Sequence, residues 1–330
     1  MIVNPAVIAL VGGSAAGGAL LLVAAAHGVA VLRGWDLGSG SQRQLELERR
    51  TYLVSTLLGF TLAFELLSLF LFVFTADALA PQFTGAMCAA GSLQASPYGY
   101  PVLLLKLLDA VLAGLWLILD HADKQGYDYP LIRVKYAALL LLAPPALVEA
   151  GLQAAYFAGL RPEVITSCCG SLFGEGGRGV GADLASLPPA LAGGGLAAVL
   201  LLALGSALVF LRTGRGALAT GLLSAAALPV ALAAVVGVIS PYVYELPTHH
   251  CPFCLLQREY HHLGYPLYAA LLLGSVAGAG VALLAPFRAT PSLAEAVPAL
   301  QRRLARLALA GLGVFGALSA FVVLASGLRM

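Results

Sequence analysis

The chain has 330 residues, of which 60% are hydrophobic and only 10% are charged, and its formal net charge is +2. Its mean hydropathy is +0.91. Such a composition excludes a water-soluble globular protein, because most of the surface has too few polar side chains to face water. The sequence also lacks a basic surface for nucleic acid and a nucleotide-binding loop. It predicts an integral membrane protein surrounded by membrane lipid.

Eight apolar runs are long enough to cross a bilayer as helices, which requires about 20 residues each. We therefore expect an all-α fold, a polytopic membrane bundle of about 8 transmembrane helices. Residues Met1 to Ala6 carry no Lys or Arg, which favours a retained first span over a cleaved signal peptide. In chain order the expected spans are 5–32, 51–76, 100–121, 134–158, 190–212, 217–241, 265–287 and 306–327.

The basic residues predict the orientation, because Lys and Arg are retained on the cytoplasmic side of a membrane. Thirteen of the eighteen lie in alternate connections, near 33–50, 122–135, 212–216 and 288–306. We therefore expect a multi-pass protein of the bacterial inner (cytoplasmic) membrane with both termini and all five cysteines on the outer side. That compartment permits disulfides. Residues 292–306 predict a capped amphipathic helix on the cytoplasmic surface.

Two outer connections share a pattern that indicates an internal repeat. One begins at Cys88 and the other at Cys251; each has Leu-Gln five and six residues later, followed by Gly-Tyr-Pro before an apolar run. Gly91 occupies the position that Cys254 holds in the second copy. The pattern favours two duplicated four-helix units. The expected organisation is an N-terminal unit at 1–160, an outer Gly-rich cysteine loop at 161–189 and a C-terminal unit at 190–330.

The segment 249–258 reads HHCPFCLLQR and carries the most chemistry in the chain. Pro252 favours the first turn of a helix, which would place Cys251 at a helix N-terminus and promote its thiolate. Two thiols and nearby histidines also suit zinc or copper. The candidate metal-binding histidines are His249, His250, His261 and His262.

The order Cys251, Cys254, Gln257 and Arg258 resembles the C-x-x-C-x-x-[QE]-R hairpin of the DsbB family of membrane disulfide oxidases. The resemblance covers about residues 248–275. It implies that Cys251 and Cys254 form a redox-active pair, that Arg258 with Gln257 binds a quinone, and that a thioredoxin-like extracytoplasmic protein is the partner. That family has a second cysteine pair in its next outer loop, whereas this chain has no cysteine after Cys254.

The remaining cysteines are the candidates for a second dithiol. Cys168 and Cys169 are adjacent and so rarely bond to each other, because the ring would be strained. They can exchange with Cys251, with Cys88 or with an external protein, or they can form static disulfides between loops. Both alternatives stay open at the level of sequence.

Four ionisable residues fall inside the expected spans, where such groups are rare and call for a reason. One alternative is a proton or cation route, and the other is a polar clamp between helices. They are Glu65, Lys106, Asp109 and Glu149.

The sequence as a whole favours a membrane thiol-disulfide oxidoreductase that passes electrons between extracytoplasmic dithiols and a membrane quinone. The alternatives are a soft-metal-binding membrane transporter, with zinc or copper as its ion, and a non-catalytic membrane subunit whose structural disulfides shape a docking surface for other membrane subunits.

Overall fold

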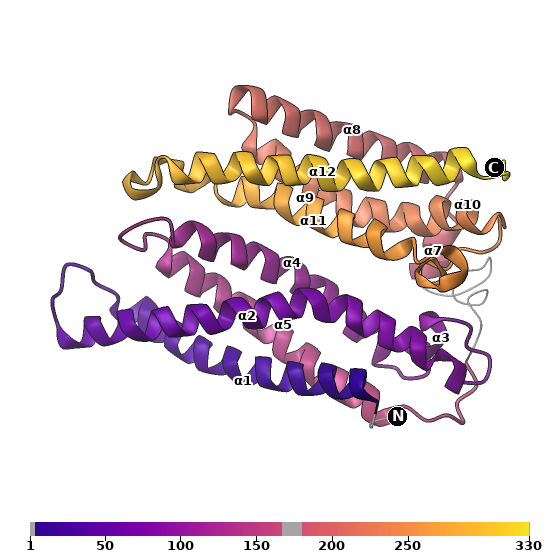
Figure 1. Cartoon of the computed structure of the whole chain (residues 1–330), viewed down its shortest axis with the longest axis horizontal. Helices are drawn as coiled ribbons and strands as arrows, with labels where there is room; N and C mark the ends of the chain where they lie inside the picture. Colours follow the sequence, from indigo (N-terminus) through magenta and orange to yellow (C-terminus); the bar gives the residue numbers. More distant parts are fainter. Residues whose placement is uncertain (1–3, 167–179, 330) are drawn as a thin grey trace. The chain divides into compact units, whose positions relative to one another are not determined.

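The computed structural model describes residues 4–166 and 180–329, and every regular element in that part of the chain is helical. Eight helices or helical segments are long and apolar enough to cross a membrane. The expected all-α, polytopic fold is therefore confirmed (Figure 1). The long helices are α1 (Pro5–Gly34), α2 (Gln42–Leu79), α4 (Gly99–Asp123), α5 (Ile132–Gly159), α8 (Pro189–Thr213), α9 (Ala217–Ala234), α11 (Gly264–Leu283) and α12 (Ala296–Ala325).

Short elements join these helices. The sixth span runs from α9 through a π-helical turn, η2 (Val235–Ile239), into α10 (Ser240–Tyr244). Pro241 lacks the N–H that an α-helix needs at that point, and the N–H of Ser240 bonds back to Val235 O, five residues earlier. The other short elements are η1 (Ala80–Gln82), α3 (Ala89–Gln94), α7 (Val180–Ala185), η3 (Cys254–Leu256), η4 (Arg258–Tyr260), η5 (Ala285–Ala289) and η6 (Pro291–Leu293).

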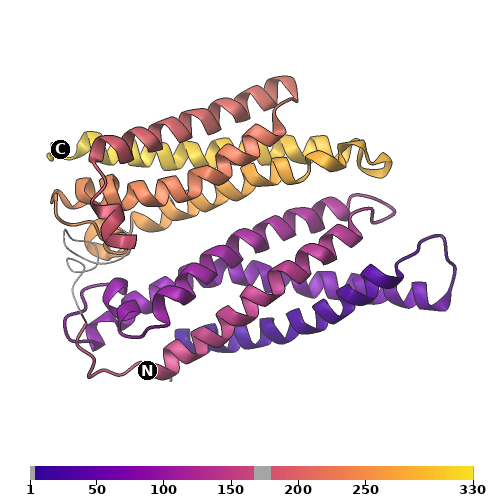
Figure 2. The ribbon, with the colours of Figure 1, turned by 180° about the vertical axis from the view of Figure 1, so that it is seen from behind.

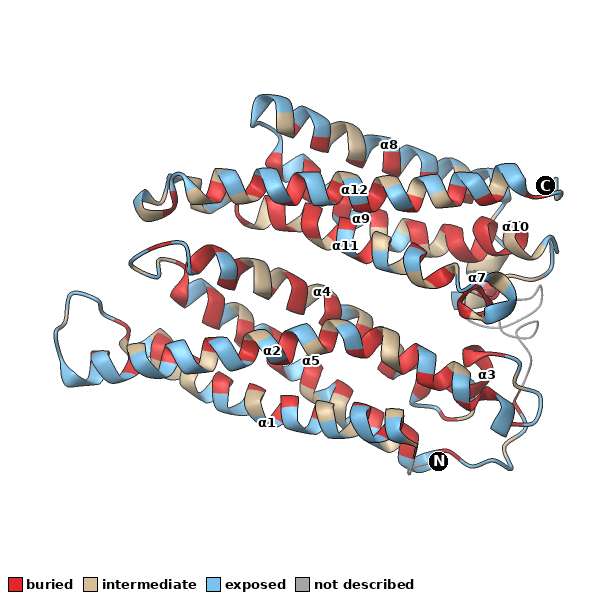
Figure 3. Cartoon of the chain, viewed as in Figure 1, coloured by how far each residue is buried: buried red, intermediate tan, exposed pale blue. Residues whose placement is uncertain are grey.

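The chain forms two compact units. Unit 1 comprises residues 1–73, 96–160 and 286–300, and its core lies between α1, α2, α4 and α5. Trp116 and Tyr136 are among its largest fully buried side chains, and the Trp116 indole donates a hydrogen bond of 3.0 Å to Lys135 O. Buried and exposed residues alternate along each of these helices (Figure 3), as expected of helices that pack on one side and face lipid on the other.

Unit 2 comprises residues 74–95, 161–285 and 301–330, and its core lies between α8, α9, α11 and α12. The view from behind shows these four helices running alongside one another (Figure 2). Gly274 of α11 lies against α12 so closely that an added Cβ would come within 2.7 Å of Leu312 N. Close backbone approach at small residues is how helices associate in lipid, where no hydrophobic force drives them together.

Two expected boundaries are corrected by the structure. The second span begins at Gln42, nine residues before the apolar run, because a polar first section continues the helix and pairs Arg50 with Glu46 one turn earlier. The prediction of a separate surface helix over 292–306 is wrong. Helix α12 runs unbroken from Ala296 to Ala325, since Pro298 falls in its first turn and no later residue interrupts it.

Candidate functional site: a buried cluster of three cysteines

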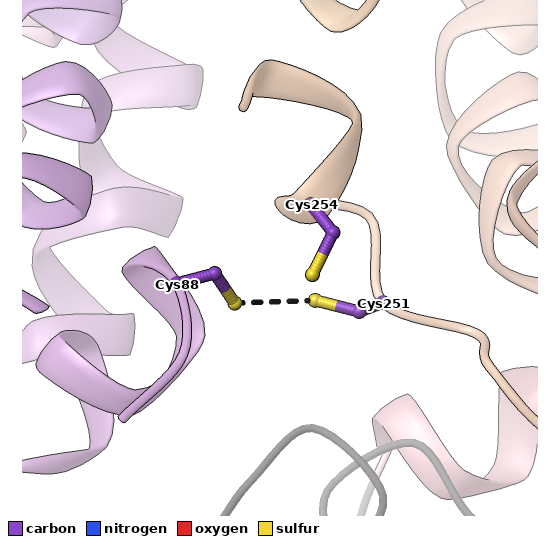
Figure 4. A group of neighbouring side chains, drawn as sticks. All are labelled: Cys88, Cys251 and Cys254. Carbon is purple, nitrogen blue, oxygen red and sulfur yellow. Dashed lines mark hydrogen bonds between the residues drawn. The ribbon is translucent and has the colours of Figure 1, made fainter. Parts of the chain in front are cut away.

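Three cysteines come together in unit 2 (Figure 4). The sulfurs of Cys88, Cys251 and Cys254 all lie within 4.8 Å of one another, and the Sγ atoms of Cys88 and Cys251 are 3.6 Å apart. The exposed fractions of the three residues are 0%, 0% and 4%. We call this group the three-cysteine centre. It joins two segments, the Cys88 loop (residues 80–95) and the Cys251 loop (residues 245–263).

The conformation of the Cys88 loop depends on Gly85 and on backbone contacts with Thr166. Gly85 has φ +87°, a left-handed conformation that favours glycine, and a Cβ there would collide with Thr166 O. The Thr166 N–H donates to Thr84 O at 3.0 Å. Cys88 then precedes α3 with an extended backbone, and the N–H of Gly91 donates to Cys88 O at 3.0 Å. These contacts fix the direction of the Cys88 side chain.

Polar contacts join the two loops beside the sulfurs. The Gln257 side chain donates to Met87 O at 2.7 Å and to Asp77 Oδ1 at 3.3 Å. The same oxygen of Asp77 accepts the N–H of Ala89 at 3.0 Å. Gln257, which the family resemblance assigns to a quinone, thus uses its amide to connect the cysteine-bearing loops. Arg258 is exposed on η4.

Two tyrosines hold the Cys251 turn from the helices on either side. Tyr244 at the end of α10 donates to Cys251 O at 2.6 Å, and Ser240 Oγ donates to the same oxygen at 3.3 Å. Tyr268 of α11 donates to Pro252 O at 2.7 Å. Sequence reasoning missed these positioning residues, although their places flanking the C-x-x-C motif were a usable signal.

The expected helix beginning at Pro252 is not formed. The chain turns at Pro252 and Phe253, makes the short 3₁₀ helices η3 and η4, and starts a long helix only at Gly264. His261 and His262 both have φ of +55°, which ends any helical run before α11. The prediction that a helix dipole activates Cys251 is therefore wrong.

The four candidate histidines separate into different environments. His250 Nδ1 lies 2.9 Å from Val236 O, and His262 Nδ1 lies 2.7 Å from Leu256 O. A carbonyl oxygen only accepts, so both Nδ1 atoms carry the hydrogen. His261 is exposed.

His249 differs from the other three. Its Nε2 is buried and has no hydrogen-bond partner among the described residues. Burial lowers the pKa of His249 below its usual value, with a smaller opposing effect from the neighbouring Cys88 and a further lowering by His250. Its ring packs 4.3 Å from the Tyr244 ring, measured between centroids. His249 is thus a half-buried imidazole whose Nε2 lacks a hydrogen-bond partner among the described residues and whose ring interacts electrostatically with Cys88.

The other candidate residues lie elsewhere. Cys168 and Cys169 lie outside the described residues. Glu65, Lys106, Asp109 and Glu149 come together within unit 1, as described below.

Three sulfurs at this spacing support two kinds of chemistry: shared coordination of one soft cation, or transfer of a disulfide from one pair to another. Comparison of the chain with models of protein families, with curated proteins and with solved structures found no match.

Proposed function

We propose that the protein is a membrane protein that binds a soft metal ion, Cu(I) or Zn(II), through the thiolates of Cys88, Cys251 and Cys254. The observation that supports this function is the mutual approach of three buried sulfurs within 4.8 Å. Thiolates are the ligands that select Cu(I) and Zn(II) among common cellular metals.

The sulfur spacing suits a shared ion. A Zn–S bond of about 2.3 Å at tetrahedral angles places two sulfurs about 3.8 Å apart. Cys88 and Cys251 are 3.6 Å apart, and no pair in the centre exceeds 4.8 Å. Small side-chain rotations bring all three sulfurs to bonding distance of one ion.

Burial also favours a metal. Thiol-disulfide exchange requires a second thiolate to reach a sulfur, whereas Cys88 and Cys251 have no exposed surface and Cys254 has 4%. A buried thiolate is costly, and a bound cation lowers that cost. The same burial that hinders an external protein dithiol therefore favours coordination.

The coordination number distinguishes the two metals. Three thiolates form a complete trigonal site for Cu(I), while Zn(II) in proteins takes four ligands. Among the described residues, His249 is the candidate for a fourth ligand, because its buried Nε2 has no hydrogen-bond partner and its ring is close enough to interact with Cys88.

We further propose that the centre faces the outside of a bacterial inner membrane. The support is the concentration of Lys and Arg in the connections at the opposite ends of the spans. A soft cation would then be captured at the outer face, as expected of a metal transporter or of a metal-binding membrane subunit.

Metal titration under reducing, oxygen-free conditions tests the proposal. We expect one Cu(I) or one Zn(II) per chain, with metal–sulfur distances of about 2.3 Å for zinc by X-ray absorption. The variant with Cys88, Cys251 and Cys254 all changed to Ser should bind none, and the matched control Cys168→Ser, Cys169→Ser should bind as the wild type. Equal binding by the triple variant would refute the metal centre.

The contact between Cys88 and Cys251 favours a second candidate function, thiol-disulfide oxidoreduction. In such a reaction two thiols of the centre pass two electrons and two protons to a quinone, giving one disulfide and one quinol. A Cys88 thiolate could then attack Cys251 of a Cys251–Cys254 disulfide, forming a Cys88–Cys251 bond and releasing the Cys254 thiolate. Electrons would come from a thioredoxin-like dithiol partner.

Thiol trapping separates the two functions. Alkylation followed by mass spectrometry should show the same three thiols before and after quinone is added to the metal-free protein. A disulfide that forms with quinone and disappears with an added dithiol would instead support oxidoreduction and contradict a purely metal-binding role.

A further inference from the structure

Unit 1 contains a cluster of ionisable side chains within its long apolar helices. All four side chains are buried: the exposed fractions are 6% for Glu65, 1% for Lys106, 2% for Asp109 and 1% for Glu149. They come from α2, α4 and α5, and ionisable groups in such positions are rare unless they serve a function. The cluster consists of Glu65, Lys106, Asp109 and Glu149.

Lys106 is held by two partners. Its Nζ lies 3.0 Å from Glu149 Oε1 and donates a hydrogen bond of 3.0 Å to Ser68 Oγ. The Ser68 hydroxyl lies 3.0 Å from Glu65 Oε2 and 3.0 Å from the backbone Glu65 O, and its single hydrogen is available to either acceptor. An ammonium, a hydroxyl and two carboxyl groups thus form a continuous polar chain across three helices.

Asp109 is the exception in this cluster. Both of its carboxyl oxygens are buried, and neither has a hydrogen-bond partner among the described residues. It lies one turn after Lys106 on α4 and interacts electrostatically with Glu149, Glu65 and Lys106. A buried carboxylate without a hydrogen bond loses several kcal/mol of solvation, and proton binding avoids that loss.

Counting charges leads to the same conclusion. Three ionised carboxylates and one ammonium would leave a net charge of −2 in the membrane interior. Glu149 has the ammonium as its partner and Glu65 has the Ser68 hydroxyl, so Asp109 is the group least able to remain ionised. Helix α1 adds no charge to this cluster. Gly17 of α1 lies next to Glu65, and the ionisable side chains of α1 are His27 and Arg33, ten or more residues further along the helix.

A second cluster in the same unit shows what a fully satisfied arrangement looks like. Lys135 pairs with Asp120 at 3.1 Å and Asp123 at 2.7 Å, Lys124 pairs with Asp120 at 2.6 Å, and Asp123 also accepts the N–H of Leu131 at 2.9 Å. Two ammonium groups balance two carboxylates. The balanced charges of that cluster are sufficient for a structural role in holding α4 and α5 together. The charges of the cluster around Asp109 are not balanced in this way.

We propose that Asp109 is a proton-binding site inside the membrane-spanning part of unit 1, occupied at neutral pH, beside the chain of Glu65, Lys106 and Glu149. The ligand is a proton rather than a metal cation. A metal cation needs several oxygen ligands together, whereas one oxygen of Glu65 and one of Glu149 lie against Ser68 and Lys106, and the Lys106 ammonium would repel a metal cation. The site is independent of the three-cysteine centre, and a protonatable carboxyl in a span is a usual component of proton-coupled membrane proteins.

Infrared spectroscopy of the purified protein in lipid nanodiscs tests this site. At neutral pH we expect a C=O band of a protonated carboxylic acid that shifts in D₂O, decreases at alkaline pH and does not respond to added Na⁺. The band should be lost in Asp109→Asn and retained in the control Glu46→Gln, which changes an exposed carboxyl on α2. Absence of the band, its persistence in Asp109→Asn, or its removal by Na⁺ at constant pH would overturn the proposal.

Thermal unfolding distinguishes a proton-binding role of Asp109 from a purely structural role, because a structural role predicts a lower melting temperature for Asp109→Asn. Asparagine has the size of a protonated aspartic acid, so Asp109→Asn should keep the melting temperature of the wild type or raise it. If Asp109 is instead an ionised clamp, its neutralisation should lower the melting temperature, as Asp123→Asn should do in the satisfied cluster by removing a buried charge partner of Lys135.

Discussion

Replacing Cys88 by serine gives the strongest test of the proposed metal site, because Cys88 is the proposed ligand that comes from a different loop than Cys251 and Cys254. The apparent binding free energy of a four-ligand zinc site is about 10–16 kcal/mol, or about 2.5–4 kcal/mol per ligand. At 1.4 kcal/mol per tenfold change, Cys88→Ser should weaken metal binding by about 10²–10³-fold. Cys251 and Cys254 alone should still bind, but weakly.

Competition with a chromophoric chelator measures this change directly, and thermal unfolding provides a second measurement. Free metal at 100 times the wild-type dissociation constant should stabilise the wild type by about 2.7 kcal/mol, and most of that gain should vanish in Cys88→Ser. Ser92→Ala, a small buried change on α3, controls for disturbance of the Cys88 loop. If Cys88→Ser binds metal as tightly as the wild type, Cys88 is not a ligand and the proposed geometry is wrong.

Three further changes address the surroundings of both sites. His249→Ala should weaken Zn(II) binding by at least tenfold and leave Cu(I) binding within about twofold in the same titrations, because only zinc needs a fourth ligand; equal effects on both metals would contradict the assignment. Gln257→Leu should lower the free energy of unfolding by about 1–3 kcal/mol, since it removes the donor to Met87 O, and the loss is measured by denaturant titration. Lys106→Gln should enlarge the infrared band of protonated carboxyl groups at neutral pH, because the carboxyl groups of the cluster lose their cation and bind another proton. An unchanged or smaller band would count against the charge balance inferred for unit 1.

The helices were predictable because length and hydropathy alone specify a span. Both Gly-Tyr-Pro sequences begin a long helix, α4 at Gly99 and α11 at Gly264, as the repeat suggested. The errors arise where polar sequence continues a helix beyond the apolar run, as at the start of α2. Hydropathy detects the part of a helix that lies in lipid and gives no signal for a helical extension into water.

The site was only partly predictable. The C-x-x-C motif identified Cys251 and Cys254, but the contact with Cys88 joins residues 163 positions apart. That contact depends on tertiary hydrogen bonds, such as Gln257 to Met87 O, which no local pattern specifies. Likewise, the sequence placed Asp109 near Lys106, while its lack of a hydrogen-bond partner appears only once the neighbouring helices are in place.

The sequence pattern shared by the two loops contains three cysteines rather than four. Cys88 and Cys251 hold equivalent first positions in the pattern, and Gly91 holds the position of Cys254. A Cβ on Gly91 would lie 2.6 Å from the Ala86 Cβ and 2.8 Å from its Cα, so the first copy has no room for a second cysteine.

Gly91→Cys should therefore destabilise the protein by about 1–3 kcal/mol through overpacking, measured by denaturant titration, without tightening zinc binding. A stable Gly91→Cys protein that binds zinc more tightly than the wild type would show that the first loop can supply a fourth sulfur. If the variant behaves as expected, the two loops are limited to three thiolates. Of the two proposed metals, only Cu(I) would then be fully coordinated by these loops' sulfurs, and Zn(II) would need a ligand of another type, for which we propose His249.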